Sequence, residues 1–326
     1  MQVRRKLLNI LSDGMYHSGE ALGSSLAISR MSVWKHIRTL RECGIPLEVV
    51  KGKGYRLPGP VELLDRQAIL AALRTESRMR LSALDTFIEI DSTNNRLRQR
   101  ALEGAPSGTV CLAEMQHAGR GRRNRHWVSP FAANLYLSLL WRSATAATEL
   151  GGLSLAAGIA IIRTLESFGI DCAGLKWPND VVVDGAKLAG ILIDVVGESG
   201  GPCAVIIGIG INVAMPAAAG MQIDREWTDL CHLTGKRRFP RNQLAARILD
   251  NILAVMAEFE RAALQPFLDE WRRHDVVHGR LVDLHLPNEV IHGKACGIDP
   301  GGALLIETGA GRRRFASGEV SLRVAS

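Results

Sequence analysis

The chemically most active part of the sequence is a glycine-rich loop from Gln116 to Trp127, which carries four arginines within six residues. Guanidinium groups at this density repel one another unless an anion binds, and the glycines let the backbone approach that anion closely. A polyphosphate fits this requirement best. The loop lacks the last glycine of a G-x-G-x-x-G dinucleotide motif, at Asn124, and the chain has no P-loop sequence. We therefore expect a nucleoside triphosphate to bind through neither motif. A solvated basic loop and a second nucleic-acid contact are the alternatives.

Three further segments place functional groups beside apolar runs. Lys176-Trp-Pro-Asn-Asp180 combines a cation, an aromatic ring and two possible oxygen ligands at a turn before a predicted strand. Lys187 begins the next strand, in which Gly190 leaves space for a ligand or another backbone. Asp91-Ser-Thr-Asn94 ends a predicted strand and opens a predicted helix. Taken alone, each lysine is more often a surface charge and the last segment a helix cap, but a cap and a ligand site can coincide.

These segments must be positioned by a central domain in which helices and strands are mixed. Periodicity and capping predict helices at 65–74, 95–102, 154–168 and 241–264. Apolar runs and turn residues predict strands at 86–90, 109–114, 134–141, 180–183, 187–196 and 203–211. The strands come in runs, and Asp184-Gly185 is typical of a hairpin, so we expect an α+β domain with a mixed sheet.

Composition limits the class of protein. The chain has 326 residues, 47% of them apolar, which predicts two or three folded domains. Its longest apolar run, from Gly151 to Ile162, is 12 residues long, whereas a membrane span needs about 20. The six cysteines form no C-x-x-C pair and no metal-ligand pattern, and the N-terminus lacks a secretion signal. We expect free thiols, no contact with a membrane and a cytoplasmic location.

Positive charge is concentrated at the N-terminus, because residues 1–60 hold ten Lys/Arg and four Asp/Glu, a balance of +6 out of +7 for the chain. Helices are predicted before Asp13-Gly14, at 19–26 and at 30–43, followed by a hairpin at 46–57. This pattern indicates a winged helix-turn-helix that binds DNA, and a small helical domain with a solvated charged face is the alternative. The residues expected to bind DNA are Gly19, Ser29, Arg30, Ser32, Lys35, His36, Arg38, Lys51 and Lys53.

The combined motifs DSTN, Q-x-A-G-R-G-R-R-x-R-x-W, KWPND, KLAGIL and GIGIN, behind a winged helix, resemble the bacterial bifunctional biotin protein ligases and biotin operon repressors. The resemblance covers essentially the whole chain. It implies an α+β multidomain protein: a winged helix at 1–60, a mixed-sheet α/β catalytic domain similar to class II synthetases at 63–275, and an SH3-like β-barrel at 276–326. Two positions depart from the family pattern, where Asn124 replaces a common glycine and His126 a common lysine.

The resemblance implies a two-step reaction. Biotin and Mg-ATP give biotinyl-5′-AMP and pyrophosphate, and a lysine of a biotin carboxyl carrier protein then takes the biotin. Residue by residue, it implies catalytic roles for Lys187, Arg122, Arg120 and Asp180. It implies a biotin site made of Ser92, Thr93, Asn94, Gln116, Arg120, Gly121, Arg122, Lys187 and Gly190. It implies an ATP and adenylate site made of Arg122, Arg123, Lys176, Asn179, Asn212 and Trp227, with Trp227 over the adenine. Mg²⁺ is expected to arrive with ATP and not in a protein cage.

The same resemblance implies three partners: the biotin carboxyl carrier protein of acetyl-CoA carboxylase, biotin operator DNA, and a second copy of the chain once the adenylate is bound. Two rival functions stay open. A lipoate ligase shares the fold but would lack the arginine loop and the winged helix. A regulator that senses biotin without turnover would bind biotin but release no ATP-dependent pyrophosphate.

Overall fold

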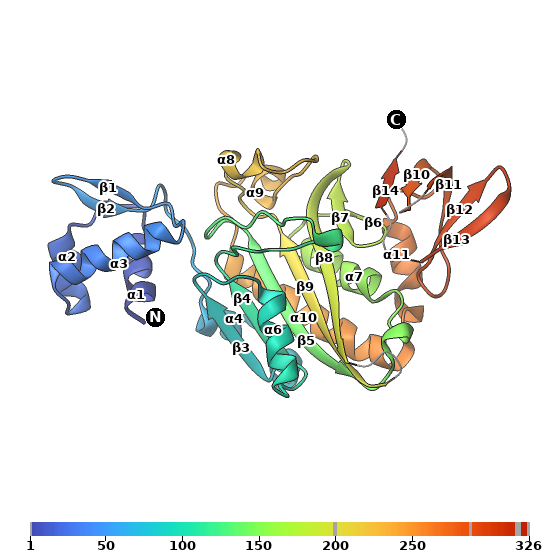
Figure 1. Cartoon of the computed structure of the whole chain (residues 1–326), viewed down its shortest axis with the longest axis horizontal. Coiled ribbons are helices and arrows are strands. Elements are labelled where there is room, and N and C mark those ends of the chain that lie inside the picture. The colour runs from blue at the N-terminus through green and yellow to red at the C-terminus, as the bar shows by residue number, and fades with distance from the viewer. Residues whose placement is uncertain (1, 198–200, 287–288, 317–320, 325–326) are drawn as a thin grey trace.

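The computed structural model describes residues 2–197, 201–286, 289–316 and 321–324. Three parts follow one another along the long axis of the molecule (Figure 1): a small helical part with a β-hairpin, a large central part built on one sheet, and a C-terminal part made of strands. Within these residues no helix combines the length and the apolar character needed to span a membrane.

The N-terminal part is a winged helix, as predicted. It consists of α1 (Gln2–Leu11), α2 (Gly19–Leu26), α3 (Arg30–Glu42), β1 (Glu48–Val50) and β2 (Gly54–Arg56). Ser18 and Ser29 begin α2 and α3 because their hydroxyls accept the backbone N–H groups of Ala21 and Ser32. The buried face of α3 is formed by Val33, Ile37 and Leu40, which pack against leucines of α1.

The central part contains a seven-stranded mixed sheet in the order β3-β4-β5-β9-β8-β7-β6. Only β3 and β4 run parallel, so the predicted mixed sheet is confirmed. The strands are β3 (Ala83–Phe87), β4 (Thr109–Ala113), β5 (Leu135–Ser143), β6 (Gly174–Lys176), β7 (Asp180–Val183), β8 (Ala186–Gly197) and β9 (Cys203–Ile211). The strand predicted at 86–90 begins three residues earlier, at Ala83, and β6 was not predicted.

Helices cover both faces of this sheet (Figure 1). The α-helices are α4 (Arg66–Ala72), α5 (Thr75–Arg80), α6 (Thr93–Leu102), α7 (Leu153–Glu166), α8 (Ala217–Gly220), α9 (Leu230–Thr234), α10 (Arg241–Ala262) and α11 (Leu268–His274). Short 3-10 turns lie at Arg122–Asn124, Ala147–Glu149 and Gln265–Phe267. The two longest helices, α7 and α10, pack together in the main core, whereas α6 covers the opposite face through Leu97 and Ala101. The four helices predicted for the central domain correspond to α4, α6, α7 and α10. Helices α5, α8, α9 and α11 were not predicted.

The C-terminal part is an antiparallel sheet of β10 (Leu281–His285), β11 (Val290–Ile298), β12 (Leu304–Thr308), β13 (Gly311–Phe315) and β14 (Ser321–Val324). Its strand order is β13-β12-β11-β10-β14, and the two outer strands do not pair with each other in the described residues. The closed barrel expected from the sequence is therefore not seen, although the all-antiparallel sheet is. The indole N–H of Trp177 donates to the Gly302 carbonyl at 3.1 Å and joins this sheet to the central part.

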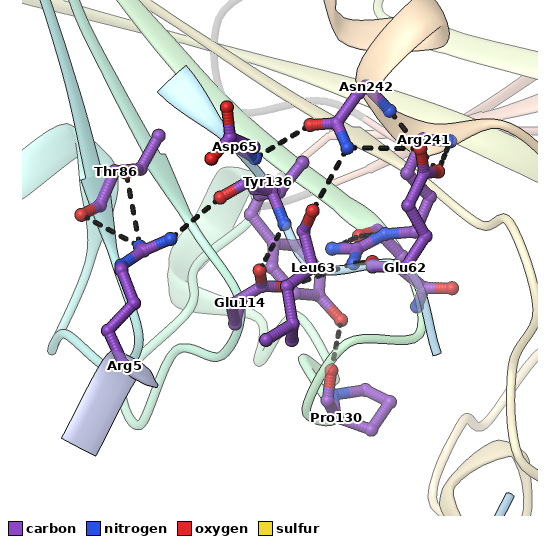
Figure 2. Close-up of polar contacts among 12 residues, drawn as sticks. Arg5, Glu62, Leu63, Asp65, Thr86, Glu114, Pro130, Tyr136, Arg241 and Asn242 are labelled. Atoms are coloured by element: carbon purple, nitrogen blue, oxygen red, sulfur yellow. Dashed lines mark hydrogen bonds and ion pairs between the residues drawn. The ribbon is translucent and has the colours of Figure 1, made fainter. Parts of the chain in front are cut away.

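The segment that links the winged helix to the central part is held by a buried ionic network (Figure 2). Arg241 begins α10, and its guanidinium lies 2.9 Å from the Glu114 carboxylate, with side chains 4% and 1% exposed. The same guanidinium donates to the carbonyls of Glu62 and Asn134. Glu114 also accepts the backbone N–H of Leu64 at 2.5 Å. The linker is thereby fastened to the ends of two central strands.

Arg5 adds a contact from the winged helix to the same region. Its guanidinium donates to the Leu64 carbonyl at 2.8 Å, and to the carbonyl and hydroxyl of Thr86 at 3.2 and 3.1 Å (Figure 2). The first helix of the winged helix is therefore bound both to the linker and to the first strand of the central sheet.

Candidate active site

A cavity of about 740 Å³ opens beside the ends of β5, β8 and β9. Every residue expected to contact a small molecule or to act in catalysis lines it, although the residues come from distant parts of the chain. The set is Ser92, Thr93, Asn94, Gln116, Arg120, Gly121, Arg122, Arg123, Lys176, Asn179, Asp180, Lys187, Gly190, Asn212 and Trp227. The four segments singled out from the sequence thus belong to one site.

The sheet register explains the floor of the cavity. Tyr136 is paired with Gly210, Gly210 with Gly190, and Gly190 with Asp180, so these residues form one row across four strands. A Cβ atom on Gly210 would lie 2.5 Å from the Trp127 ring, and one on Gly190 would lie 3.0 Å from it. The two glycines therefore give the indole of Trp127 a place against the sheet. Sequence reasoning assigned Trp127 no role, although it ends the arginine-loop motif.

One side of the cavity is a network of neutral polar groups at the start of α6. The Gln116 side-chain oxygen accepts the backbone N–H of Thr93 at 2.9 Å and the Thr93 hydroxyl at 3.1 Å. Ser138 on β5 is completely buried and places its hydroxyl 2.7 Å from that of Thr93 and 2.6 Å from the Asn94 side-chain oxygen. Ser92 caps the helix. Ser138 was missed, although a lone serine inside an apolar strand was a signal.

The arginine loop has an unusual backbone. Arg123 and Asn124 both have a φ of +57°, in the left-handed region that glycine adopts most easily. Asparagine tolerates this region better than most residues, which explains why Asn124 can stand where the family pattern has glycine. Arg120 donates to the Asn95 side chain at 2.6 Å and lies 3.7 Å from Asp194. Arg122 donates to the Asn179 side chain at 3.4 Å, and burial lowers its pKa.

Lys187 lines the cavity beside Asp180 and Trp127. Its ammonium is 2.5 Å from Asp180, and the two side chains are 16% and 20% exposed. Burial lowers the pKa of Lys187, and the neighbouring Asp180 opposes that shift. The ammonium also lies 5.3 Å from the centre of the Trp127 ring. Burial likewise lowers the pKa of Lys176. The wall thus holds desolvated cations, which bind anions strongly because water screens them little.

The loop that carries Trp227 is hydrogen-bonded to the start of the strand that carries Lys187. The Lys187 N–H donates to the Glu226 carbonyl, and the Thr228 N–H donates to the Lys187 carbonyl, both at 3.0 Å. The Asn212 amide donates to the carbonyls of Lys187 and Thr228, so it orients the backbone of this loop. Asn212 also lines the cavity, where the sequence analysis expected part of an ATP and adenylate site. The ring of Trp227 packs against Gly220, where a Cβ atom would lie 2.1 Å from it.

The cavity wall also contains cations to which the sequence assigned no individual role. Arg125 and Arg225 both line it, and Arg323 of β14 lines it from the C-terminal sheet. Burial lowers the pKa of Arg125, and the nearby Arg225 and Arg323 lower it further. Among the described residues no cluster of three His, Cys, Asp or Glu side chains could hold a metal ion.

The residues expected to bind DNA fall into two groups. Arg30, Lys35 and Arg38 of α3 and Lys51 and Lys53 of the hairpin are exposed. The others are less accessible or have another task. Gly19 is buried against the Arg30 side chain and the Tyr55 ring, and the Ser29 and Ser32 hydroxyls bond to each other at 3.1 Å.

His36 is half-buried, and burial lowers its pKa, with a further contribution from the nearby Arg4. It is therefore less accessible than Lys35 and Arg38 of the same helix. The accessible cations belong to the outer face of α3 and the tip of the wing, which are the two surfaces that a winged helix presents to DNA.

The fold and the site together define a class of protein. A cavity with a neutral polar end and a desolvated cationic end suits the joining of a carboxylic acid to a nucleotide, and the winged helix adds a nucleic-acid binding part. The model of the Biotin/lipoate A/B protein ligase family matches residues 86–212, that of an HTH domain residues 3–56, and that of the Biotin protein ligase C terminal domain residues 276–323.

One curated relative matches almost the whole chain, and other relatives match about three quarters of it. The Bifunctional ligase/repressor BirA of Escherichia coli is 41% identical over 98% of this chain and 97% of its own length. The Biotin--[acetyl-CoA-carboxylase] ligase of Mycobacterium tuberculosis is 35% identical over 73% of this chain and 88% of its own. The solved structure of a biotin protein ligase from Aquifex aeolicus in complex with biotin and ATP has a TM-score of 0.65 and 31% identity, and covers 75% of this chain and 100% of that one. The chain belongs to the biotin protein ligase family, and to its bifunctional ligase/repressor members.

Proposed function

We propose that this chain adenylates biotin with ATP, transfers the biotin to a carrier-protein lysine, and represses a biotin operator when the adenylate is retained. The observation that carries the ligase activity is the position of Lys187. Its ammonium, paired with Asp180, lines the same cavity as Gln116 and Arg122. In that position it can contact a carboxylate held from one side and a phosphate held from the other.

The first step joins two anions. A biotin carboxylate oxygen bonds to the α-phosphorus of ATP, the bond from that phosphorus to the bridging oxygen breaks, and pyrophosphate leaves. Lys187, Arg122 and Arg120 would lower the repulsion between the carboxylate and the phosphate and stabilise charge on the phosphoryl oxygens. Mg²⁺ bound to ATP would neutralise further phosphate charge.

The biotin and nucleotide ends would be held by different groups. Ser92, Thr93, Asn94 and Gln116 would hydrogen-bond the ureido head, while Gly121 leaves room for the ligand and Gly190 borders the biotin site beside the Trp127 ring. Arg123, Lys176 and Asn179 would contact the phosphates, and Asn212 would act through the loop that it orients.

The second step needs a neutral amine. The acceptor lysine nitrogen bonds to the acyl carbon, the bond from that carbon to the phosphate oxygen breaks, AMP leaves, and the amine loses a proton. Asp180 is the carboxylate beside Lys187 that could take this proton.

We propose the biotin carboxyl carrier protein of acetyl-CoA carboxylase as the acceptor, in keeping with the name of the Mycobacterium tuberculosis relative.

The pH dependence of adenylation follows from the lowered pKa of Lys187. The reaction requires the ammonium form, so the rate should fall as pH rises through that pKa, beginning below the range of an ordinary lysine. Asp180→Asn removes the group that raises this pKa and should move the fall to still lower pH. A pH series of kcat for pyrophosphate release checks both. An identical profile in the two proteins would contradict the assignment of the titrating group.

Trp227 would cover the adenine. Gly220→Ala places a methyl group inside the present position of the Trp227 ring and must displace it. We expect the KM for ATP to rise by roughly tenfold, the size of a lost stacking contact of about 1 kcal/mol plus local strain, with the KM for biotin unchanged. Steady-state kinetics at varied ATP measures this, with Gly309→Ala as control because that site is open. Equal changes in both KM values would mean that Trp227 is not specific to the nucleotide.

Repression would depend on pairing of two chains. Strand β7 pairs with β8 only as far as Gly190, and in the described part of the chain residues 192–197 of β8 have no strand neighbour on that side. An unpaired strand edge can add a strand from a second copy, which supports our proposal of a homodimer formed when the adenylate is bound. Two winged helices would then bind one operator together.

Two experiments test the proposed function. Biotin- and ATP-dependent pyrophosphate release, followed by labelling of a biotin carrier domain in the same tube, tests the ligase; biotin binding without either would favour a regulator that only senses biotin. A gel shift with a biotin operator, with and without biotinyl-AMP, tests the switch, and equal affinity in both would contradict it. Because ATP, carrier protein and operator are cytoplasmic, we propose the same location for this chain.

A further inference from the structure

The outer face of α3 is not purely cationic. Met31, Trp34, Lys35 and Arg38 follow one another at the spacing of a helical stripe, with Trp34 at the border of the buried face of this helix and the other three farther from it. Met31 is 62% exposed and Trp34 is 45% exposed. The stripe therefore combines two large apolar side chains with two cations, and all four residues are exposed.

The exposure of Met31 and Trp34 to water needs an explanation, because contact with water does not stabilise large apolar side chains. An indole left in water forgoes the free energy that burial of so large a ring would give. The Arg38 guanidinium lies 5.3 Å from the centre of the Trp34 ring, and Arg38 also pairs with the exposed Glu42 at 3.1 Å. The residues of α3 that pack in the protein core are Val33, Ile37 and Leu40.

Charge and position identify what covers the stripe. Trp34 is the fifth residue of α3, in the half of a recognition helix that reaches base edges in the major groove. Lys35, Arg38 and Arg30 surround it, and residues 1–60 carry a net charge of +6. The apolar group that the major groove offers beside phosphates is the 5-methyl group of thymine. A second protein would have to be acidic and apolar together to fit as well.

We propose that Trp34 packs against the 5-methyl group of a thymine in the operator and so helps to set the sequence that this chain recognises. The proposal rests on the proposed binding of operator DNA and adds to it a residue that sequence reasoning left out because it is apolar. Lys35 and Arg38 would hold the helix in the groove through phosphates, which carry no sequence information. Trp34 would then distinguish thymine from the other bases at one position of each half-site.

The test begins by selecting duplexes from a random pool with the full chain in the presence of biotin and Mg-ATP. Each thymine of the selected duplex is then replaced by deoxyuridine, which removes only the methyl group. We expect one position per half-site at which this replacement weakens binding about fourfold, the value of one buried methyl group. Trp34→Ala should bind the thymine and uracil duplexes equally at that position, whereas Trp34→Phe should still distinguish them.

Lys35→Ala is the matched control on the same stripe. It should weaken binding to all duplexes, reduce the salt dependence of binding, and keep the thymine-to-uracil ratio. A selected duplex that tolerates uracil at every position, or a Trp34→Ala protein that keeps the fourfold ratio, would overturn the inference. Failure to select any sequence would instead contradict operator binding itself. Trp34→Ala should keep the thermal midpoint of the protein, because the side chain is exposed.

Discussion

Replacing Lys187 by alanine should abolish biotinyl-AMP formation while the protein stays folded. The ammonium is the cation that can contact both reacting anions, and it acts in a cavity where water screens charge poorly. Loss of one such group typically lowers kcat by about 10²–10³. Here the loss should lie at the upper end, because the neighbouring Asp180 carboxylate would be left without its cation and would repel both substrates.

The fold should survive because the Lys187 side chain borders a cavity and its partner Asp180 is 20% exposed, so water can reach the carboxylate. Pyrophosphate release and the thermal midpoint measure the two effects separately. Lys236→Ala is the control, since that exposed lysine lies outside the cavity wall. A Lys187→Ala protein with an adenylation rate near that of the parent would show that another group does this work.

Replacing Arg241 by methionine should lower stability more than any surface substitution. Glu114 is 1% exposed and would become a buried carboxylate without its cation, which typically costs about 3–5 kcal/mol. The carbonyls of Glu62 and Asn134 would lose donors as well. The thermal midpoint should fall by roughly 10 °C, and the linker should become more sensitive to proteases.

A double variant can separate the cost of the unpaired Glu114 charge from the other effects of replacing Arg241. Glu114→Gln combined with Arg241→Met removes the charge but keeps a side-chain oxygen for the Leu64 N–H, so the double variant should be more stable than Arg241→Met alone. Arg272→Met is the control, because its partner Asp269 is 94% exposed, and it should change the midpoint little. Equal midpoints for the single and double variants would contradict a dominant role for the buried charge.

Local signals explain what could be predicted from the sequence. Ser18 and Ser29 marked the starts of α2 and α3 because a cap acts within one helical turn. The start of β3 was predicted less accurately, because it depends on pairing with β4, in which Ala83 is paired with Thr109. The short strand β6 is defined by its pairing with β7 and by a bridge from Leu175 to Asp275. Such pairings join residues that are distant in the sequence.

The same distinction applies to the site. Motif residues such as Gln116 and Lys187 could be placed at one site because their types and spacing resemble a known family. Arg323 could not, since its contribution depends on which sheet lies beside the cavity. Trp34 was missed for another reason. Expectations for DNA contacts favour charged and polar side chains, so an apolar residue on the same face received no role.

The central cations of the site already have partners within the chain: Lys187 lies beside Asp180, and Arg120 lies near Asp194 and Asn95. An anion that binds there exchanges places with a carboxylate, so few salt ions are taken up or released. Operator binding is different, because each phosphate contact sets free a condensed counterion. Rising ionic strength should therefore weaken the hold on DNA steeply while biotin still fills the active site. The salt concentration would then change operator binding by this protein and leave biotin binding at its active site nearly unchanged.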